Sequence, residues 1–248
     1  MDIKLISYNI QSWDVNERRI EGILDLINRH NPDIICFQEV TIFWYSLLKK
    51  KLSNIYAFTG RDRYYGDKNQ PKRDFERNSI AFRKDRFKEI KSRTYWLGPD
   101  VNNPSIFDKC ILKRIFTTVV LEDLNSHKKI QVISTHFDDR FEDIREKQGL
   151  ILANYFKQQK GPLILAGDFN SEPKENAYRA LKQVAIDVGE EFNETGKTWH
   201  TYDKYPPERI DYIFRNKDIK IKSFDIIKDV YKGLPPSDHY PLKSTVAI

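Results

Sequence analysis

Six short polar motifs carry most of the chemistry that this sequence offers, and each lies at the end of an apolar run. In chain order they are Ser7-Tyr8-Asn9, Gln38-Glu39, Ser134-Thr135-His136, Gly167-Asp168-Phe169-Asn170, Arg209-Ile210-Asp211-Tyr212 and Ser237-Asp238-His239. Most of the apolar runs are typical of buried strands, so the motifs are predicted to meet at one edge of a sheet. Carboxylates, amides and two histidines gathered there would form a divalent-metal site suited to phosphate-ester hydrolysis.

Glu39 is the best candidate for a metal ligand. It follows the apolar run 34–37, which places its carboxylate at the rim of a sheet rather than in the core. Mg²⁺ favours one or two carboxylates and keeps several of its waters. Asn9 would complete the metal shell or bind phosphate, and Asp238 would reach the metal or a second ion. The alternatives are an acidic helix N-cap for Glu39 and an ordinary turn residue for Asn9.

The segment Gly167-Asp168-Phe169-Asn170 is the strongest single motif. It follows the buried run 163–166, and Gly167 allows a close approach of backbone before two polar side chains appear. Asp168 is predicted to hold the attacking water or accept its proton, and Asn170 to donate to a phosphate oxygen. An Asx turn is the alternative, and it explains one of these residues more easily than both.

Asp211 and His239 are predicted to form a pair. A carboxylate beside an imidazole orients the ring and favours its charged form. His239 would then be a cationic donor to the transition state or the base for the water. A capped surface turn is the alternative for Ser237-Asp238-His239.

Two further residues are candidate phosphate contacts. His136 ends the predicted strand 130–135, and Arg114 begins the neighbouring strand 114–122. Both are expected to point at the same phosphate. A neutral structural histidine is the alternative for His136.

The order of predicted elements indicates the fold. Helical spacing predicts helices over 17–30, 43–52, 145–156 and 177–181. Strands are predicted over 4–9, 34–37, 56–59, 78–83, 86–96, 114–122, 130–135, 162–166, 210–214 and 242–248. Helices alternate with strands early in the chain and strands adjoin later. This α/β order predicts two sheets packed face to face, with helices on their outer faces.

Composition limits the class of protein. The 248 residues fit one domain over 1–248, with 40% hydrophobic residues for its core and a net charge of +6 that favours anionic ligands. The two cysteines are isolated, as expected in a reducing compartment. No apolar run approaches the roughly 20 residues of a membrane span, and the first residues lack the apolar region of a signal peptide. We therefore expect a cytoplasmic monomer that does not insert into membranes.

Taken together, the six motifs resemble those of the endonuclease/exonuclease/phosphatase superfamily, the DNase I-like proteins. The resemblance runs from Ser7 to His239. It implies a four-layered α/β sandwich of two mostly antiparallel sheets, and Mg²⁺- or Mn²⁺-dependent attack of water on a phosphate ester, a phosphodiester first of all. The implied roles are metal binding by Glu39 with Asn9 and Asp238 nearby, Asp168 and Asn170 at the nucleophile and the phosphate, and Asp211 orienting His239.

Within the superfamily the motifs are most similar to those of compact bacterial nocturnin-like and sphingomyelinase-like members. Abasic-site endonucleases carry an acidic residue where this chain has Gln11, and a Tyr-x-Pro-Asn segment where it has Ser134-Thr135-His136. Arg114, Arg145, Gln148 and Thr198-Trp199-His200 favour the nocturnin-like and sphingomyelinase-like pattern. The resemblance therefore specifies the chemistry better than the substrate.

Two other functions stay open. A nuclease acting on DNA or RNA would need a basic groove with stacking aromatics. Such a groove has candidates in Arg61, Arg63, Tyr64, Tyr65, Lys68, Lys72 and Arg73, although a solvated charge run explains the same residues. A small phosphorylated substrate would need a closed pocket, for which Trp96, Trp199 and Tyr202 are candidates. The second function is a non-catalytic module that binds phosphate or nucleic acid, and such a protein would usually have lost Glu39, Asp168 or His239.

Overall fold

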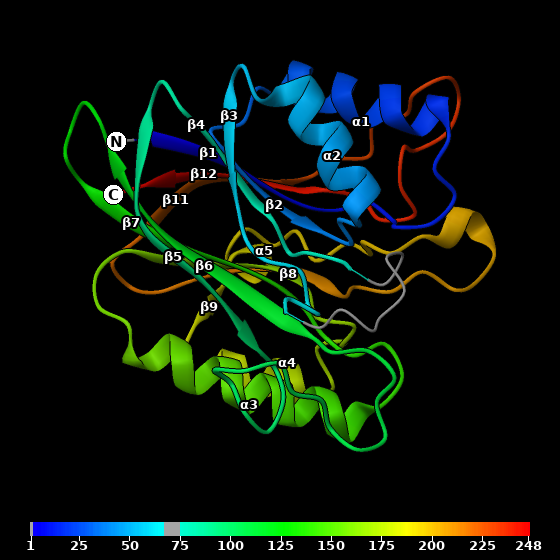
Figure 1. Ribbon diagram of the computed structural model, residues 1–248, viewed down its shortest axis with the longest axis vertical. Coiled ribbons are helices and arrows are strands. Elements are labelled where there is room, and N and C mark those ends of the chain that lie inside the picture. Colours follow the sequence, from blue (N-terminus) through cyan, green and yellow to red (C-terminus); the bar gives the residue numbers. More distant parts are fainter. Residues whose placement is uncertain (1, 67–74) are drawn as a thin grey trace.

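Two six-stranded sheets packed face to face form the centre of the molecule (Figure 1). The computed structural model describes residues 2–66 and 75–248. The first sheet contains, in spatial order, β11 (Lys220–Ile226), β12 (Leu242–Ala247), β1 (Asp2–Asn9), β2 (Ile34–Gln38), β4 (Ile80–Arg83) and β3 (Tyr56–Thr59). The second contains β5 (Phe87–Trp96), β6 (Ile115–Asp123), β7 (Lys129–His136), β8 (Leu163–Asp168), β10 (Asp211–Arg215) and β9 (Ile186–Asp187).

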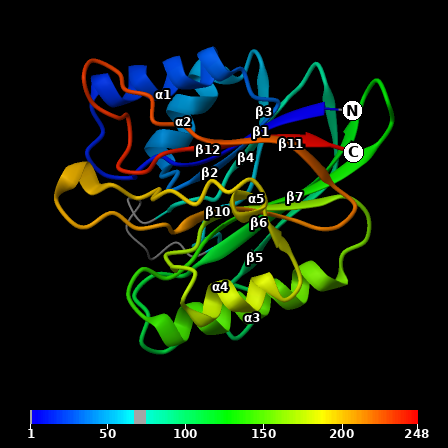
Figure 2. The same ribbon diagram turned by 180° about the vertical axis from the view of Figure 1, so that it is seen from behind.

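Helices cover the outer face of each sheet. Helices α1 (Glu17–His30) and α2 (Ile42–Leu52) lie on the first sheet, and α3 (Glu142–Gln158) and α4 (Asn176–Lys182) lie on the second (Figures 1 and 2). Two short helices, α5 (Val188–Glu191) and η2 (Thr201–Asp203), belong to connections. The predicted four-layered α/β sandwich is therefore confirmed. Its sheets are mostly antiparallel, with one parallel pair in each.

The alternation of side chains along each strand divides the core into layers. In β1, Ile3 and Leu5 face the second sheet, whereas Ile6 and Tyr8 pack with the helices α1 and α2. Successive strand residues point to opposite faces of a sheet, so both faces of these strands are apolar because both are covered.

The same alternation aims the polar residues of the motifs into the sandwich. Asn9 continues the inward-facing row of Ile3 and Leu5, and Asp168 continues that of Ile164 and Ala166. The inward-facing rows of β2, β7 and β10 likewise have a polar residue at this end of the sandwich. It is the last residue in β2 (Gln38) and β7 (His136) and the first in β10 (Asp211). The seam between the sheets is thus apolar along most of its length and polar at one end.

The parallel pairs bring the motifs to the same end. Helix α1 connects β1 to β2, and α3 connects β7 to β8, as a parallel pair requires. In the first pair Asn9 lies opposite Gln38, and in the second His136 lies opposite Asp168. The carboxyl ends of both pairs therefore present polar side chains to one another across the seam.

The opposite end of the sandwich is closed by an arginine. The Arg86 guanidinium lies 2.7 Å from Asp33 Oδ2 beside the first sheet and 3.1 Å from Asp123 Oδ2 in the second. It also donates to the carbonyl of Asp2. The two sheets are thus joined by charge at this end and by the motif residues at the other.

The strand β11 was not predicted, nor were β9, α5 and η2. Strand β11 is an edge strand, half exposed along its length, with a bulge between Ile221 and Ser223. The bulge interrupts the two-residue alternation by which a strand is recognised. All the predicted helices and strands are present; the bounds of 17–30 and 56–59 agree with the prediction, and the ends of the others are shifted by up to a few residues.

Two sequence expectations concern the thiols and the membrane. Cys36 is buried in β2 and Cys110 is partly buried, and both are free thiols. In residues 2–66 and 75–248, no helix combines the length and the apolar character that crossing a membrane requires.

Candidate active site

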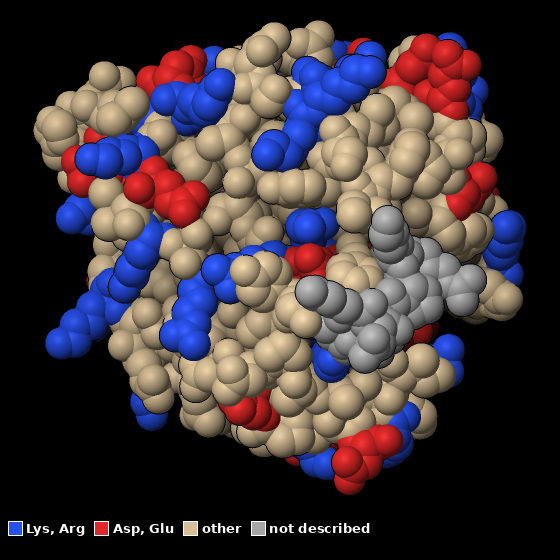
Figure 3. All heavy atoms as spheres, viewed as in Figure 1, with Lys and Arg blue, Asp and Glu red and all other residues tan. Residues whose placement is uncertain are grey.

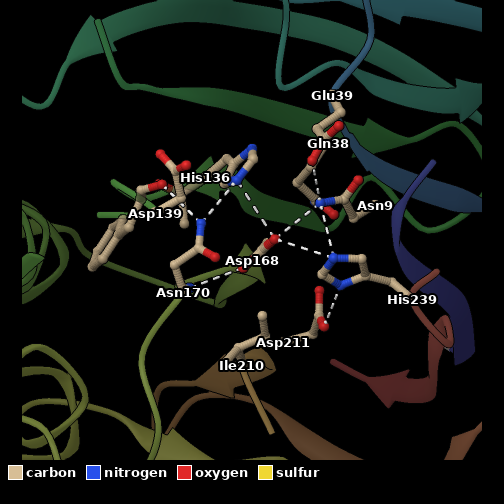
Figure 4. Close-up of polar contacts among 12 residues, drawn as sticks. Asn9, Gln38, Glu39, His136, Asp139, Asp168, Asn170, Ile210, Asp211 and His239 are labelled. Atoms are coloured by element: carbon tan, nitrogen blue, oxygen red, sulfur yellow. Dashed lines mark hydrogen bonds and ion pairs between the residues drawn. The ribbon is translucent and has the colours of Figure 1, made fainter. Parts of the chain in front are cut away.

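Asp168 occupies the centre of the polar end of the seam (Figure 4). Its Oδ1 accepts a hydrogen bond from the backbone N–H of Asn170 at 2.9 Å, and its Oδ2 accepts one from Asn9 Nδ2 at 2.9 Å. The same Oδ2 lies 3.5 Å from His136 Nε2 and 3.7 Å from His239 Nε2. The Asp168 carboxylate therefore lies within 3.7 Å of residues from four motifs, namely its own and those of Asn9, His136 and His239.

The surroundings of Asp168 disfavour its charge. Burial and the neighbouring carboxylate of Asp211 raise its pKa to about 7, against the opposing effect of His239 and of hydrogen bonds from Asn170 and Asn9. A proton therefore competes for this oxygen near neutral pH. A carboxyl group in this state is suited to exchanging protons with water.

Asp211 and His239 form the predicted pair. His239 Nδ1 lies 2.8 Å from Asp211 Oδ2, and both side chains are buried. Burial alone would lower the pKa of His239, but Asp211 and Asp168 raise it to about 10. The ring is therefore cationic, with its Nε2 directed toward Asp168. Because Ser237 and His239 are buried, the surface-turn alternative does not describe this segment.

Glu39 and Asn9 lie on the side of the first sheet. Glu39 Oε1 accepts from Asn9 Nδ2 at 3.0 Å, and its Oε2 accepts from the backbone N–H of Ser12 at 2.6 Å. Burial would raise the pKa of Glu39, but these hydrogen bonds and His239 lower it. The N-cap of α2 is Thr41, not Glu39, so the capping alternative is excluded.

The backbone of Glu39 has a left-handed conformation, with φ of +60°. This conformation is costly for a residue with a side chain and recurs at functional sites. Gln11 and Asn170, on two other loops of the site, also have positive φ. The chain therefore accepts local strain at three points to bring these loops together.

Asp238 is close enough to Glu39 for their charges to interact. Ser237 Oγ is 3.4 Å from its Oδ1. Burial and the charge of Glu39 raise the pKa of Asp238, whereas His239 opposes that shift. The structure therefore brings Asp238 into the same electrostatic cluster as the other motif residues.

Asn170 and His136 form the side of the second sheet. Asn170 Nδ2 donates to the carbonyl of Phe137 at 3.1 Å and lies 3.0 Å from His136 Nε2. Burial and the nearby Arg114 lower the pKa of His136 well below its usual value, so its ring is neutral. The Asx turn between Asp168 and Asn170 is present, and it leaves the Asn170 side chain to hold His136.

Arg114 is buried next to His136. Its Nη2 donates to Asp139 Oδ1 at 2.7 Å, and its buried Nε has no hydrogen-bond partner among the described residues. Arg63, Glu76 and Asn78 line a small cavity together with these two residues. A buried donor without an acceptor, beside a cavity, is suited to an anionic oxygen.

The charges of the site fit a divalent cation. The carboxylates of Glu39, Asp168, Asp211 and Asp238 converge here, and His239 is the titratable cation placed directly among them. Ligand atoms of Asp168, Asp211 and His239 lie within 4.8 Å of one another. Asp211 and His239 bind each other and are therefore less available to a metal. The oxygen atoms of Glu39 and Asn9 are the better match for Mg²⁺ or Mn²⁺.

Arg19 is a component of the site that the sequence reasoning did not identify. Its guanidinium is fully buried, lies 5.7 Å from the centre of the Trp44 ring and donates to five backbone carbonyls, those of Ile10, Gln11 (3.1 Å), Trp13 (2.7 Å), Asp14 (2.7 Å) and Pro236 (2.8 Å). These carbonyls belong to the loop after Asn9 and the loop before Asp238. Helical spacing gives a signal, since Arg19 shares the buried face of α1 with Ile23 and Leu26.

The three aromatic residues considered for a closed pocket lie apart. The backbone of Trp199 forms an isolated antiparallel β-bridge with that of His239, and the Tyr202 hydroxyl donates to Gln11 Oε1 at 3.2 Å. Trp96 lies on β5 and lines a separate cleft between the edge strands β3 and β5. Of the basic candidates, Lys68, Lys72 and Arg73 lie outside the described residues.

Comparison with known proteins gives a family match and several relatives. The model of the Endonuclease/Exonuclease/phosphatase family matches residues 6–239. The chain is 27% identical to the probable CCR4-Not complex 3'-5'-exoribonuclease subunit Ccr4 of Encephalitozoon cuniculi, covering 92% of this chain and 56% of the relative. It is 25% identical to human nocturnin, covering 89% and 56%. The chain thus spans about half the length of these curated relatives.

Solved structures show the same fold. An endonuclease/exonuclease/phosphatase from Bacteroides vulgatus superposes with a TM-score of 0.87 at 24% identity, covering 100% of this chain and 99% of the other. The mannosyl-6-phosphatase Bt3783 of Bacteroides thetaiotaomicron gives 0.85 at 22% identity, covering 99% and 100%. At these identities the likeness concerns the fold alone.

Proposed function

Because the chain belongs to the endonuclease/exonuclease/phosphatase family, whose members are generally hydrolases of phosphate esters, we propose that it is a Mg²⁺- or Mn²⁺-dependent phosphoesterase. The reaction is attack of water on a phosphate ester, with a phosphodiester as the preferred substrate. One observation carries this proposal: a buried carboxylate, Asp168, lies between an amide–carboxylate pair and two imidazoles.

The metal side of the site is formed by Glu39, Asn9 and Asp238. Glu39 is ionised, and the other two provide an amide and a second carboxylate beside it. A bound divalent ion would neutralise charge on the phosphate and favour ionised Asp168. In this role Asn9 also connects the metal side to Asp168, because its amide contacts both Glu39 and Asp168.

The remaining residues act on the water and the phosphate. Asp168 holds the attacking water and accepts its proton. His239, kept cationic by Asp211, donates from Nε2 to a phosphate oxygen on which charge develops. Asn170, His136 and Arg114 form the phosphate-binding side, where Arg114 Nε, which has no hydrogen-bond partner within 2–66 and 75–248, provides a donor.

The test is hydrolysis of bis-p-nitrophenyl phosphate and p-nitrophenyl phosphate with Mg²⁺, with Mn²⁺ and with EDTA. We expect metal-dependent turnover that EDTA abolishes and that is faster on the diester. Glu39→Gln should lower kcat/KM by about 10²-fold or more, because an ionised ligand is replaced by a neutral one. Metal binding measured by calorimetry should weaken in the same variant.

Glu122→Gln is the matched control, since Glu122 lies on β6 at the other end of the sandwich and contacts His127. It should leave both readouts unchanged. Turnover that persists in EDTA would refute the metal dependence. Metal binding without turnover of either ester or of a wider phosphate-ester panel would favour the non-catalytic binding module instead.

A further inference from the structure

A second concave site lies between the edge strands β3 and β5. The cleft has a volume of about 630 Å³, and its walls include Tyr45, Arg61, Tyr65, Arg93, Trp96 and Asn102. At its base Thr59 Oγ1 donates to Ser92 Oγ at 2.8 Å, and the backbone N–H of Arg61 donates to Thr94 Oγ1 at 2.9 Å. The edge strands of the two sheets are thus joined by hydrogen bonds at the base of the cleft.

The cleft is cationic. No aspartate or glutamate lines it in the part of the chain that the structure describes. Figure 3 looks onto this face and shows several Lys and Arg side chains around a hollow near its middle, with some Asp and Glu atoms nearby. The side chain of Arg93 donates to Asn102 Oδ1 at 2.7 Å, and that of Arg61 lies over a tyrosine ring. Within the described ranges neither arginine has a carboxylate partner, so both charges attract anions.

Aromatic rings accompany these cations. The Arg61 guanidinium lies 4.1 Å from the centre of the Tyr65 ring, and Tyr65 is 49% exposed. Tyr45 forms another wall, with the Arg77 guanidinium 4.3 Å from the centre of its ring. Arg77 is paired with Asp62 at 3.3 Å, so the cation without a carboxylate among the described residues is Arg61 beside the exposed Tyr65 ring. An exposed ring beside such a guanidinium is a combination by which proteins bind single-stranded nucleic acid.

The cleft is at the same end of the sandwich as the active site. Trp96 lies opposite Ile115, Ile115 opposite His136, and His136 opposite Asp168. Three strand spacings separate Trp96 from Asp168, which is about 14 Å. Arg63 lies between them, since its carbonyl accepts from Trp96 Nε1 at 2.9 Å and its side chain lines the small cavity beside His136. The two sites therefore adjoin across a single segment of chain.

We propose that this cleft binds the nucleotides that flank the scissile phosphate of a single-stranded nucleic acid. The inference rests on the proposed phosphoesterase function and extends it to the substrate. An extended phosphodiester chain spans the distance between the two sites, whereas a small sugar phosphate bound at Asp168 does not reach the cleft. The bases would stack on Tyr65 and the flanking phosphates would contact Arg61 and Arg93.

The test is the binding of fluorescein-labelled twelve-nucleotide oligo(dT) and oligo(U) by fluorescence anisotropy. It uses the Asp168→Asn protein in EDTA, so that no probe is cleaved. In that background Arg61→Ala with Arg93→Ala should weaken binding at least tenfold, and the salt dependence of log K should fall by about 1.4, or 0.7 for each lost phosphate contact. Tyr65→Ala should weaken binding by about tenfold with little change in salt dependence. The two probes distinguish DNA from RNA.

The control removes two positive charges elsewhere, by Lys88→Ala with Lys128→Ala at the other end of the sandwich. It should leave binding within about twofold, because contact and not net charge decides the affinity. An equal loss in the control and in the arginine variant would overturn the proposal, as would binding that neither Arg61 nor Tyr65 affects. The aryl-ester assay with Glu39→Gln reports on the phosphoesterase function separately, so either proposal can fail alone.

Discussion

Asp168 and His239 show how the environment of a side chain sets its charge. Both are buried and both approach Asp211, yet burial and Asp211 raise the pKa of the carboxyl group to about 7, while Asp211 raises that of the imidazole to about 10 against the effect of burial. The same neighbouring charge opposes a second anion and stabilises a cation. In the proposed mechanism, Asp211 thereby prepares both the proton acceptor Asp168 and the cationic donor His239.

We expect Asp211 to act only through His239. Asp211→Asn and His239→Asn should each lower kcat on the aryl diester by about 10²- to 10⁴-fold, because each removes an oriented cationic donor. The double variant should be no worse than His239→Asn alone, since both changes remove one function. Steady-state kinetics of the three variants test this expectation, with circular dichroism to confirm that each is folded. Losses that multiply would show that Asp211 has a separate role.

The residues of the site differ in how far the sequence could predict them. Asp211, His239 and Asp168 follow or precede apolar strands and carry ionisable groups, so both their position and their chemistry are visible in the sequence. Arg19 binds carbonyl oxygens, and carbonyls are common to all residues, so no sequence pattern identifies its partners. Arg114 was identified, but its pairing with Asp139 depends on a loop of irregular structure.

At the scale of the elements, the close parallel pairing of β7 with β8 places Asp168 beside His136. Gly167 lies opposite Thr135 in this pair. A Cβ added at Gly167 would be 2.1 Å from the Thr135 carbonyl oxygen, which is backbone and cannot move aside without disturbing the strand. The absence of a side chain here therefore sets the spacing of the two strands at the site.

Gly167→Ala should lower the free energy of unfolding by about 3 kcal/mol, through the clash with the Thr135 backbone. Urea denaturation followed by tryptophan fluorescence measures this change. Gly196→Ala is the control, because its added Cβ meets the ends of the Glu194 and Ile226 side chains at 3.0 Å, and these can move. Equal unfolding midpoints for the two variants would contradict the role given to Gly167.

Elements whose two faces differ in burial, or are both buried, could be predicted from the sequence. Helix α1 was predicted with its observed bounds, since Ile23 and Ile27 mark its buried face and Asn31-Pro32 ends it. Strand β11 could not, because its bulge and its exposed edge remove the alternation. Tertiary contacts, in this case pairing with β12, determine such strands.

For the whole molecule, Arg86 with Asp33 and Asp123 joins the two sheets at the end of the sandwich opposite the candidate active site. Burial would raise the pKa of Asp123, but hydrogen bonds from the Ser126 backbone and from Arg86 lower it. A carboxyl group with a lowered pKa in the folded state stabilises the protein above its ordinary pKa of 3.8. That stabilisation is lost as the pH falls through the lowered value.

Asp123→Asn should therefore be less stable than the parent near neutral pH, by about 2 kcal/mol from the loss of hydrogen bonds to a charged group. The difference should shrink as the pH falls below 3.8, because the parent then loses the same interaction. Urea denaturation at a series of pH values tests this expectation, with Asp218→Asn on an exposed turn as control. A constant difference at all pH values would exclude the charge of Asp123 as the cause.

The place of β12 in the first sheet has a consequence for the synthesis of the chain on the ribosome. This strand lies between β11 and β1, and Asp2 pairs with Ala247, so the earliest of the described strands pairs with the last of them. His239 precedes β12 directly and reaches the site from that direction. During most of its synthesis the growing chain therefore contains Asn9, Glu39 and Asp168 but not yet His239, the cation that lies near them in the folded protein. The proposed phosphoesterase site is therefore complete only after the segment 239–247 has been synthesised, and the proposed activity cannot begin before that segment has left the exit tunnel.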